Sequence, residues 1–439
     1  MTYLATAAPA AGQPTAADRD VLRKVLGASF IGNFVEWFDY ASYGYFATVI
    51  AVAFFPEFAP ASALLATFAV FAISFVIRPV GGIVWGGIGD RIGRRTALSW
   101  SILIMSGATT LIALLPSYHQ VGILAPILLL VVRMVQGFSA SGEYAGATAF
   151  IAEYAPTSRR GLFTSIVPAS TAAGLLAGSL LSAALFAMLD DAEMQAWGWR
   201  LPFLLAAPLG LIGLYIRLKL EDTPKFRAME ARHEATATPT AELFRNHRGR
   251  MAIAFGVTCL NAVGFYLILS YMPTYLMTEL GIGEAQAFLA TSISLAVYIG
   301  LIFLMGQLSD RFGRRITLVA ASILFMALTV PLFSMLDGAS FLGIVLIQIA
   351  FGALLTVNDG TLPCFLSEIF PTRVRYSGFA FSFNAANALF GGTAPFVATW
   401  LIGVTGSKLA PAWYLVAAAT VAVVAMLLAR ETAGKPLED

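Results

Sequence analysis

Long apolar segments recur along this chain, and they constrain its fold more than any other feature. A helix of about 20 mainly apolar residues crosses the hydrocarbon core of a bilayer. The apolar runs predict twelve such spans, near residues 22–48, 63–87, 96–115, 123–153, 160–188, 199–220, 250–278, 286–308, 316–336, 340–366, 375–402 and 409–430. Only 12% of the 439 residues are charged and 58% are hydrophobic, which excludes a water-soluble fold. We therefore predict an all-α polytopic membrane protein.

The positions of the basic residues predict how the chain lies in its membrane. Lys and Arg collect in the cytoplasmic loops of membrane proteins. With a cytoplasmic N-terminus, all of the 27 Lys and Arg except Arg78, Arg133, Arg200 and Lys408 fall in cytoplasmic segments. We expect a multi-pass protein of the plasma (inner) membrane with both termini cytoplasmic. The net charge of +2 gives no reason to expect a nucleic-acid partner. The apolar spans make the lipid bilayer the expected surrounding of the protein.

A hydrophilic stretch in the middle of the chain separates two sets of six predicted spans. We expect residues 1–21 to form a disordered cytoplasmic tail and residues 431–439 a short one. Residues 22–220 and 250–430 then form two six-helix halves, joined by a cytoplasmic linker at 221–249. Two homologous halves predict a binding site at their interface.

Two motifs that occur once in each half support this division. The loop Gly86-Gly-Ile-Gly-Asp90-Arg-Ile-Gly93-Arg94-Arg95 recurs as Gly306-Gln-Leu-Ser-Asp310-Arg-Phe-Gly313-Arg314-Arg315. The segment Glu153-Tyr-Ala-Pro156-Thr157 recurs as Glu368-Ile-Phe-Pro371-Thr372. An internal repeat of this kind indicates two related structural units.

The repeated G-x-x-x-D-R-x-G-R-R loop resembles that of the major facilitator superfamily, and the resemblance covers residues 22–430. Four further motifs resemble its metabolite:proton symporter family: Gly32-Asn-Phe-Val-Glu36-Trp-Phe-Asp39-Tyr40, Arg78-Pro79-Val-Gly81-Gly82, Arg133-Met-Val-Gln136-Gly137 and Trp197-Gly198-Trp199-Arg200-Leu-Pro202-Phe203. The resemblance implies a secondary transporter with a pseudo-symmetric twelve-helix fold that moves a small metabolite together with protons. Two segments, Leu115-Pro116-Ser117-Tyr118 and Glu431-Thr432-Ala-Gly-Lys-Pro436-Leu437, resemble the proline/betaine osmoprotectant transporters of this family. Their osmosensing members continue into a long charged coiled-coil tail, whereas nine residues follow Arg430 here.

Ionisable residues inside the predicted spans are candidate site residues, because an unpaired charge at mid-membrane costs several kcal/mol. They are Glu36, Asp39, Arg78, Arg133, Glu143 and Asp359. We predict that Glu36, Asp39 and Glu143 couple proton movement, since a buried carboxyl can exchange its proton as an opposing charge arrives or leaves. Arg78 can contact substrate, but it can also extend to the membrane surface or pair structurally. Asp359 can line a cavity or make a local structural bond.

The balance of these groups bears on the substrate. Acids outnumber arginines within the spans and aromatic rings are frequent there, which favours a zwitterion over a multiply charged anion. The predicted substrate-binding residues are Asn33, Trp37, Tyr40, Tyr43, Arg133, Gln136 and Tyr144. Arg133 would bind the carboxylate, although a buried pair with an acid can equally hold helices together. Proline or betaine is the favoured substrate, and a mono- or dicarboxylate such as 2-oxoglutarate, shikimate or an aromatic acid is the open alternative.

The repeated loops at the cytoplasmic ends are predicted to gate transport. Their members are Asp90, Arg94, Asp310 and Arg314, with Glu153 and Glu368 as the facing acids. Each aspartate can cap a facing helix while the arginines pair with acids, in contacts that break when the gate opens. No phosphate-binding or hydrolase motif is present, so an enzyme is not expected. A non-transporting sensor is the remaining alternative, and we expect no cofactor, no metal site and a monomer.

Overall fold

A computed structural model describes residues 16–219, 221–222, 226–227 and 239–438 of the chain. All regular elements in these residues are helices, and the described chain has no strand, which confirms the predicted fold class. Residues 1–15 of the predicted N-terminal tail, and residues 223–225 and 228–238 of the predicted linker, lie outside the described residues.

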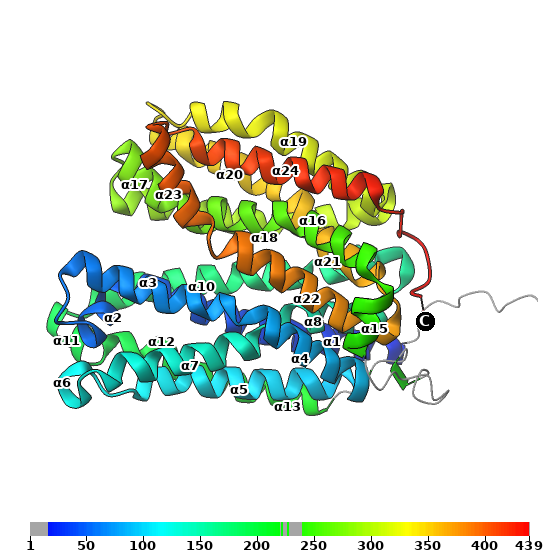
Figure 1. Cartoon of the computed structure of the whole chain (residues 1–439), viewed down its shortest axis with the longest axis horizontal. Helices are drawn as coiled ribbons and strands as arrows, with labels where there is room; N and C mark the ends of the chain where they lie inside the picture. The colour runs from blue at the N-terminus through cyan, green and yellow to red at the C-terminus, as the bar shows by residue number, and fades with distance from the viewer. Residues whose placement is uncertain (1–15, 220, 223–225, 228–238, 439) are drawn as a thin grey trace, which may run out of the picture.

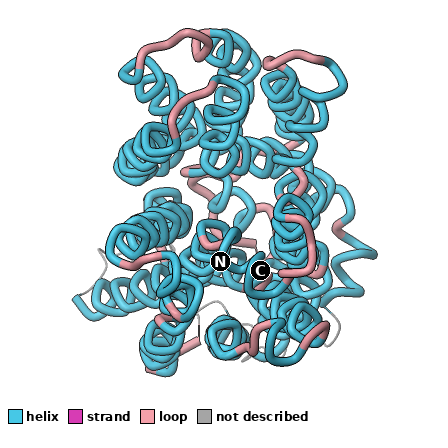
Figure 2. The backbone as a smooth tube through the Cα atoms, turned by 90° about the vertical axis from the view of Figure 1, so that its left-hand side faces the viewer, coloured by secondary structure: helices cyan, strands magenta, loops and turns pink. Residues whose placement is uncertain are grey.

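The helices fall into two bundles, one above the other in Figure 1. The first contains α1 (Ala16–Tyr45), α2 (Ala47–Phe54), α3 (Pro60–Val76), α4 (Arg78–Ile92), α5 (Arg94–Leu114), α6 (Tyr118–Val121), α7 (Leu124–Ala140), α8 (Glu143–Tyr154), α9 (Arg160–Thr164), α10 (Ile166–Met188), α11 (Asp191–Ala196), α12 (Leu201–Leu204) and α13 (Ala206–Leu218). The second contains α15 (Pro239–Asn246), α16 (Arg248–Phe265), α17 (Met272–Leu280), α18 (Glu284–Phe312), α19 (Arg314–Ser334), α20 (Phe341–Asp359), α21 (Leu362–Glu368), α22 (Arg375–Ala386), α23 (Ala394–Thr405) and α24 (Ala410–Leu428). Figure 2 shows the same helices nearly end-on.

Eleven helical segments of the described chain are long and apolar enough to cross a membrane. They are Ser62–Ile92, Arg94–Leu114, Leu124–Tyr154, Thr157–Met188, Gly198–Leu218, Arg248–Leu280, Gln286–Phe312, Arg314–Ser334, Phe341–Glu368, Thr372–Thr405 and Ala410–Leu428. Each coincides with a predicted span to within a few residues. The first predicted span corresponds to α1, whose polar Asn33, Glu36 and Asp39 lower its hydropathy although the helix is long and mostly buried.

The repeated glycine at the end of α4 and of α18 has a conformational reason. Gly93 and Gly313 both have positive φ, of 106° and 100°. This left-handed geometry is strained for residues with a side chain. It also brings an acidic side chain within 3 Å of where a Cβ atom would stand, Asp222 at Gly93 and Glu431 at Gly313. The glycine of the repeated motif therefore permits a sharp helix–helix turn closed by a carboxylate.

The two bundles meet along α4 with α22, α10 with α18, and α8 with α21. The turns after α4 and α18 lie at the same end of the molecule as α15 and the last residues of the chain (Figure 1). We call this end the basic face, because it carries Arg91, Arg94, Arg95, Arg311, Arg314 and Arg315. The end opposite to it carries α2, α6, α11 and α17.

Candidate functional site

The polar stripe of α1 is buried and divides into a packing part and a charged part. Asn33 donates from Nδ2 to the carbonyl of Val167 at 2.9 Å and to the hydroxyls of Ser170 and Thr171 at 2.9 and 2.7 Å, all on α10. The side chain of Asn33, predicted to bind substrate, thus lies between α1 and α10. Gly174 lets the helices approach, because a Cβ atom there would lie 2.7 Å from the carbonyl oxygen of Phe34.

Two ion pairs join the charged part of α1 to neighbouring helices. Arg78 of α4 places Nη2 2.8 Å from Glu36 Oε1. Arg133 of α7 places Nη1 3.0 Å from Asp39 Oδ2, and Gln136 bonds to both partners of this second pair. All five side chains are at most 4% exposed. Both arginines are therefore neutralised within the first bundle.

Aromatic rings surround the two arginines. The Arg78 guanidinium carbon lies 4.7 Å from the ring centre of Tyr40 and 4.6 Å from that of Phe75. The Arg133 guanidinium carbon lies 3.6 Å from the ring centre of Tyr43, whose hydroxyl donates to the carbonyl of Thr67. Cation–π contacts of this kind are worth about 2 kcal/mol when desolvated.

The first of these ion pairs borders the second bundle, whereas the other is enclosed. Trp37 packs against Phe265 with ring centres 5.0 Å apart, and Phe75 packs edge-on against Tyr266 at 5.7 Å. Phe265 ends α16, and Tyr266 begins the π-helical segment Tyr266–Tyr271 that follows it. Single π-helical turns within α-helices often mark functional sites.

Four buried polar atoms at this boundary have no hydrogen-bond partner among the described residues. They are Glu36 Oε2, Trp37 Nε1, the Tyr40 hydroxyl and Arg78 Nε. A buried polar atom without a partner costs about 1–3 kcal/mol, so a ligand or water that supplied the missing bonds would be favoured here. An acid, a guanidinium and ring faces together suit a small molecule that carries both charges. We call Glu36, Trp37, Tyr40, Phe75, Arg78 and Tyr266 the interface cluster.

Glu143 and Tyr144, adjacent at the start of α8, have different surroundings. Glu143 is held by both terminal nitrogens of Arg217, which also donates to the carbonyls of Leu98 and Ala28. The sequence interpretation placed Arg217 in a cytoplasmic segment, but its side chain is buried in the last turn of α13. Tyr144 stacks on Phe383 of the second bundle, with ring centres 4.5 Å apart.

Asp359 is buried in the second bundle at the end of α20. Its Oδ1 accepts from the amide of Asn261 on α16, and its Oδ2 accepts from the hydroxyl of Tyr298 on α18. No Lys or Arg of the described chain lies within ion-pair distance of it. The Asp359 carboxyl therefore has no cationic partner in that part of the chain, unlike Glu36 and Asp39 of α1.

The two repeated aspartates at the basic face each cap a helix of the other bundle. Asp90 accepts from the backbone N–H groups of Tyr376 and Ser377 at 3.1 and 2.8 Å, at the start of α22. Asp310 accepts from those of Gly161 and Leu162 at 2.8 and 2.9 Å, at the start of α9. A carboxylate at a helix N-terminus satisfies free donors and interacts favourably with the helix dipole.

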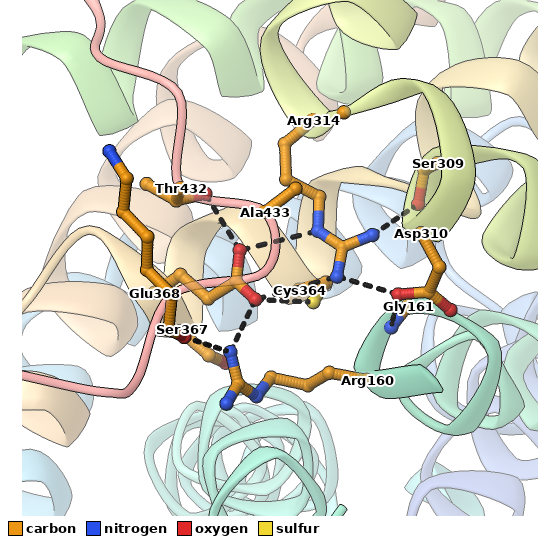
Figure 3. Close-up of polar contacts among 12 residues, drawn as sticks. Arg160, Gly161, Ser309, Asp310, Arg314, Cys364, Ser367, Glu368, Thr432 and Ala433 are labelled. Carbon is orange, nitrogen blue, oxygen red and sulfur yellow. Dashed lines mark hydrogen bonds and ion pairs between the residues drawn. The ribbon is translucent and has the colours of Figure 1, made fainter. Parts of the chain in front are cut away.

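Arginines and glutamates form a second connection between the bundles at this face. Figure 3 shows Glu368 between Arg160 of the first bundle, at 2.6 Å, and Arg314 of the second, at 3.2 Å. The related Glu153 lies 2.7 Å from Arg375 and 3.2 Å from Arg94. The structure thus brings together all six residues predicted for the gate and adds Arg160 and Arg375. Their equal spacing from Glu153 and Glu368 in the repeat is the sequence signal that identifies them.

The last residues of the chain bind to the arginines and glutamates of the basic face. Glu431 accepts from the backbone N–H groups of Arg314 and Arg315 at 2.9 and 3.0 Å, as Asp222 does from that of Arg94 in the first bundle. Thr432 donates to Glu368, and Glu438 pairs with Arg250. We call residues 431–438 the C-terminal strap. Burial acts to raise the pKa of Glu431, but four backbone N–H donors outweigh it and hold that pKa below its usual value.

Comparisons with known proteins agree with this architecture. Residues 24–243 match the family described as "Sugar (and other) transporter", and residues 254–438 match the family described as "Major Facilitator Superfamily". The glycine betaine/proline/ectoine/pipecolic acid transporter OusA of Dickeya dadantii is 39% identical over 97% of this chain and 86% of its own length. The proline/betaine transporter of Salmonella typhimurium is 37% identical over 97% of this chain and 87% of its length.

Solved structures support the fold. The proton:xylose symporter XylE bound to a bromodeoxyglucose has a TM-score of 0.79 at 18% identity, covering 96% of this chain and 98% of that one. An inward-open XylE from E. coli has a TM-score of 0.67 at 18% identity, covering 95% and 98%. The family models and the sequence relatives establish the family, and these likenesses show its fold. The chain is a multi-pass membrane transporter, not an enzyme, and it belongs to the major facilitator superfamily.

Proposed function

We propose that this protein is a proton-coupled symporter that imports a small zwitterion of the proline or betaine type. The observation that carries this proposal is the interface cluster, where Glu36 and Arg78 offer both charges beside aromatic rings at the boundary of two bundles. The names of its relatives point to the same substrate class.

The chemistry of the cluster fits each end of a zwitterion. The Arg78 guanidinium binds the carboxylate, and Glu36 with the ring faces of Trp37 and Tyr40 binds the ammonium end. The substrate replaces an internal ion pair, so each protein charge exchanges one partner for another and none is left unpaired in the membrane. This exchange avoids the penalty for an isolated buried charge.

Proton coupling is proposed for the acids of α1 and α8. A proton on Asp39 would cancel the charge that restrains Arg133, so that arginine becomes free to bind a carboxylate. A proton on Glu36 would free Arg78 in the same way, and the ring faces of Trp37 and Tyr40 would then hold the cationic end of the substrate. Arg133, Gln136 and Tyr43 then form a second layer beneath the interface cluster. Glu143 is restrained by Arg217 in the same manner.

The orientation proposed from the basic residues makes the basic face cytoplasmic, in an inner membrane, for a protein acting as a monomer. Alternating access then requires the caps of Asp90 and Asp310 to open. The ion pairs Glu153–Arg375 and Glu368–Arg160 must break with them. These contacts all join the two bundles, which supports their assignment as the cytoplasmic gate.

The test is uptake of labelled glycine betaine and proline into proteoliposomes with an alkaline interior. We expect accumulation that a protonophore abolishes and that unlabelled zwitterions compete away. Preferential competition by dicarboxylates would replace the zwitterion with an organic acid as substrate. Absence of gradient-driven uptake of either class would contradict symport.

A further inference from the structure

Asp359 is the one acid of the described chain that is buried without a cationic partner. The other buried acids, Glu36, Asp39, Asp90, Glu143, Glu153 and Glu368, each have an arginine within ion-pair distance. Asp359 is 1% exposed, and its two oxygens meet only the neutral donors Asn261 and Tyr298. The titratable groups that interact with it are Tyr298 and Tyr144.

This environment suits a carboxyl that gains and loses a proton. Burying an isolated carboxylate in an apolar interior is far more costly than burying the neutral acid. A tyrosine hydroxyl can donate to the ionised form and accept from the protonated form, so Tyr298 accommodates either state. At an ion-paired acid such as Asp39, a proton must instead compete with the arginine for the carboxylate.

We infer that Asp359 is a protonation site of the second bundle, separate from the ion pairs of α1, and that it carries one coupled proton in each transport cycle. The inference rests on the symport proposed above. It places a protonation site in each bundle, whereas the sequence pattern pointed to the first bundle alone.

The contacts around Tyr144 supply a route for release of the proton. Tyr144 belongs to the first bundle, yet its ring stacks on Phe383 and packs edge-on against Phe379 of the second. Opening of the basic face separates these rings and admits water to Asp359. The carboxyl then transfers its proton to that water, and it takes up the next one from water on the opposite side. No other bond forms or breaks.

The direct test compares Asp359→Asn with Asp337→Asn in proteoliposomes with the membrane potential clamped at zero. Asp337 is an exposed acid paired with Lys408 away from the interface cluster, so its variant serves as the matched control. Each coupled proton supports about tenfold accumulation per pH unit. We expect Asp359→Asn to lower the accumulation ratio about tenfold per pH unit, while exchange of labelled for unlabelled substrate without a gradient persists.

The outcomes separate this inference from the proposed function. Failure of the wild-type protein to accumulate a zwitterion overturns the symport proposal itself. Wild-type accumulation that Asp359→Asn leaves unchanged overturns only the assignment of Asp359. Tyr298→Phe should shift the pH profile of exchange, because it removes one donor to the carboxyl without removing the carboxyl.

Infrared difference spectroscopy of the wild-type protein covers the case in which Asp359→Asn does not fold. A pH change should produce the stretching band of a protonated carboxyl, and Asp359→Glu should displace that band. If neither the wild-type nor the Glu variant shows a titrating buried carboxyl, the assignment is wrong. Retention of the same band at the same position in Asp359→Glu would also overturn it.

Discussion

Arg375 Nη1 lies 2.7 Å from Glu153 Oε1, in an ion pair that joins the two bundles across 222 positions of sequence. Arg160 and Glu368 form the related pair in the opposite sense, at 2.6 Å. Each arginine also donates from Nε to a backbone carbonyl of its own bundle, Ser367 for Arg375 and Ala152 for Arg160. The basic face is therefore closed by two copies of one local structure, each of which reaches into the other bundle.

Breaking one of these pairs should favour an open basic face. Removing one partner of a buried ion pair costs about 3–5 kcal/mol. We expect Arg375→Ala to raise the rate of thiol labelling of Cys364 at least about tenfold, since 1.4 kcal/mol already corresponds to tenfold. Cys364 is fully buried beside Glu368, and a Cys259→Ser background leaves it as the single thiol. Lys408→Ala is the control, and equal labelling of Arg375→Ala and the parent would contradict the gate.

The C-terminal strap should stabilise the protein in a pH-dependent way. The pKa of Glu431 is lower in the folded protein than its usual value of 4.5. Stability from this group is thus complete above about pH 4.5 and is lost as the pH falls through the folded-state pKa. We expect Glu431→Gln to lower the Tm at pH 7, and the difference from wild type to shrink in acid. Thermal unfolding in detergent measures this, with the exposed Asp20→Asn as control; a difference independent of pH would rule out the carboxylate as its cause.

Substitution of Arg78 should weaken substrate binding even when the positive charge is kept. Arg78→Lys keeps the charge but loses the planar guanidinium that lies against Tyr40 and Phe75. Charge-assisted hydrogen bonds contribute about 1.5–3 kcal/mol, so KM for the zwitterion should rise by about tenfold or more. Arg200→Lys is the matched control, because Arg200 binds the carbonyls of Ala113 and Leu115 elsewhere. Initial uptake rates give KM, and a wild-type KM in Arg78→Lys would remove this residue from the site.

Packing of α1 against α10 should not tolerate one added methyl group. A Cβ atom at Gly174 would lie 2.7 and 2.8 Å from backbone atoms of Phe34 and Phe38, which cannot move independently of their helix. Overpacking of this kind costs about 1–3 kcal/mol, so Gly174→Ala should lower the Tm. At Gly107 nothing lies within 4 Å of the added atom, and Gly107→Ala should be neutral or stabilise by about 0.5–1 kcal/mol. A Tm for Gly174→Ala at or above wild type would contradict the close packing.

The spans and the family could be predicted from the sequence because the signals for both are local. The thickness of the bilayer sets the length of each apolar run. The repeated motifs that contain Asp90 and Asp310 indicate two related halves. The paired acids Glu153 and Glu368 were also recognisable, since the repeat places them at equal positions. Even α1, whose polar residues lower its hydropathy, was identifiable from the apolar residues between them.

The partners of the buried charges could not be predicted in the same way. Arg217 lies near the end of the predicted span 199–220 and counts there as a cytoplasmic basic residue. In the structure, α1, α5 and α8 cover its side chain and pair it with Glu143. Asn33, which the sequence predicts to bind substrate, donates its amide hydrogen bonds to α10, and its Oδ1 has no partner among the described residues. Depth and partner depend on which helices lie alongside, and helices distant in sequence supply them.

The sequence by itself therefore determined the membrane-spanning architecture, the internal repeat and the set of ionisable residues, because apolar length, charge and motif spacing are properties of the chain. Only the tertiary structure decided how that set is divided. It paired Glu36 with Arg78 and Asp39 with Arg133, and it left Asp359 with Asn261 and Tyr298. The physical reason is that the electrostatic state of a buried acid is set by the atoms within a few ångströms of it, and packing of separate helices places those atoms.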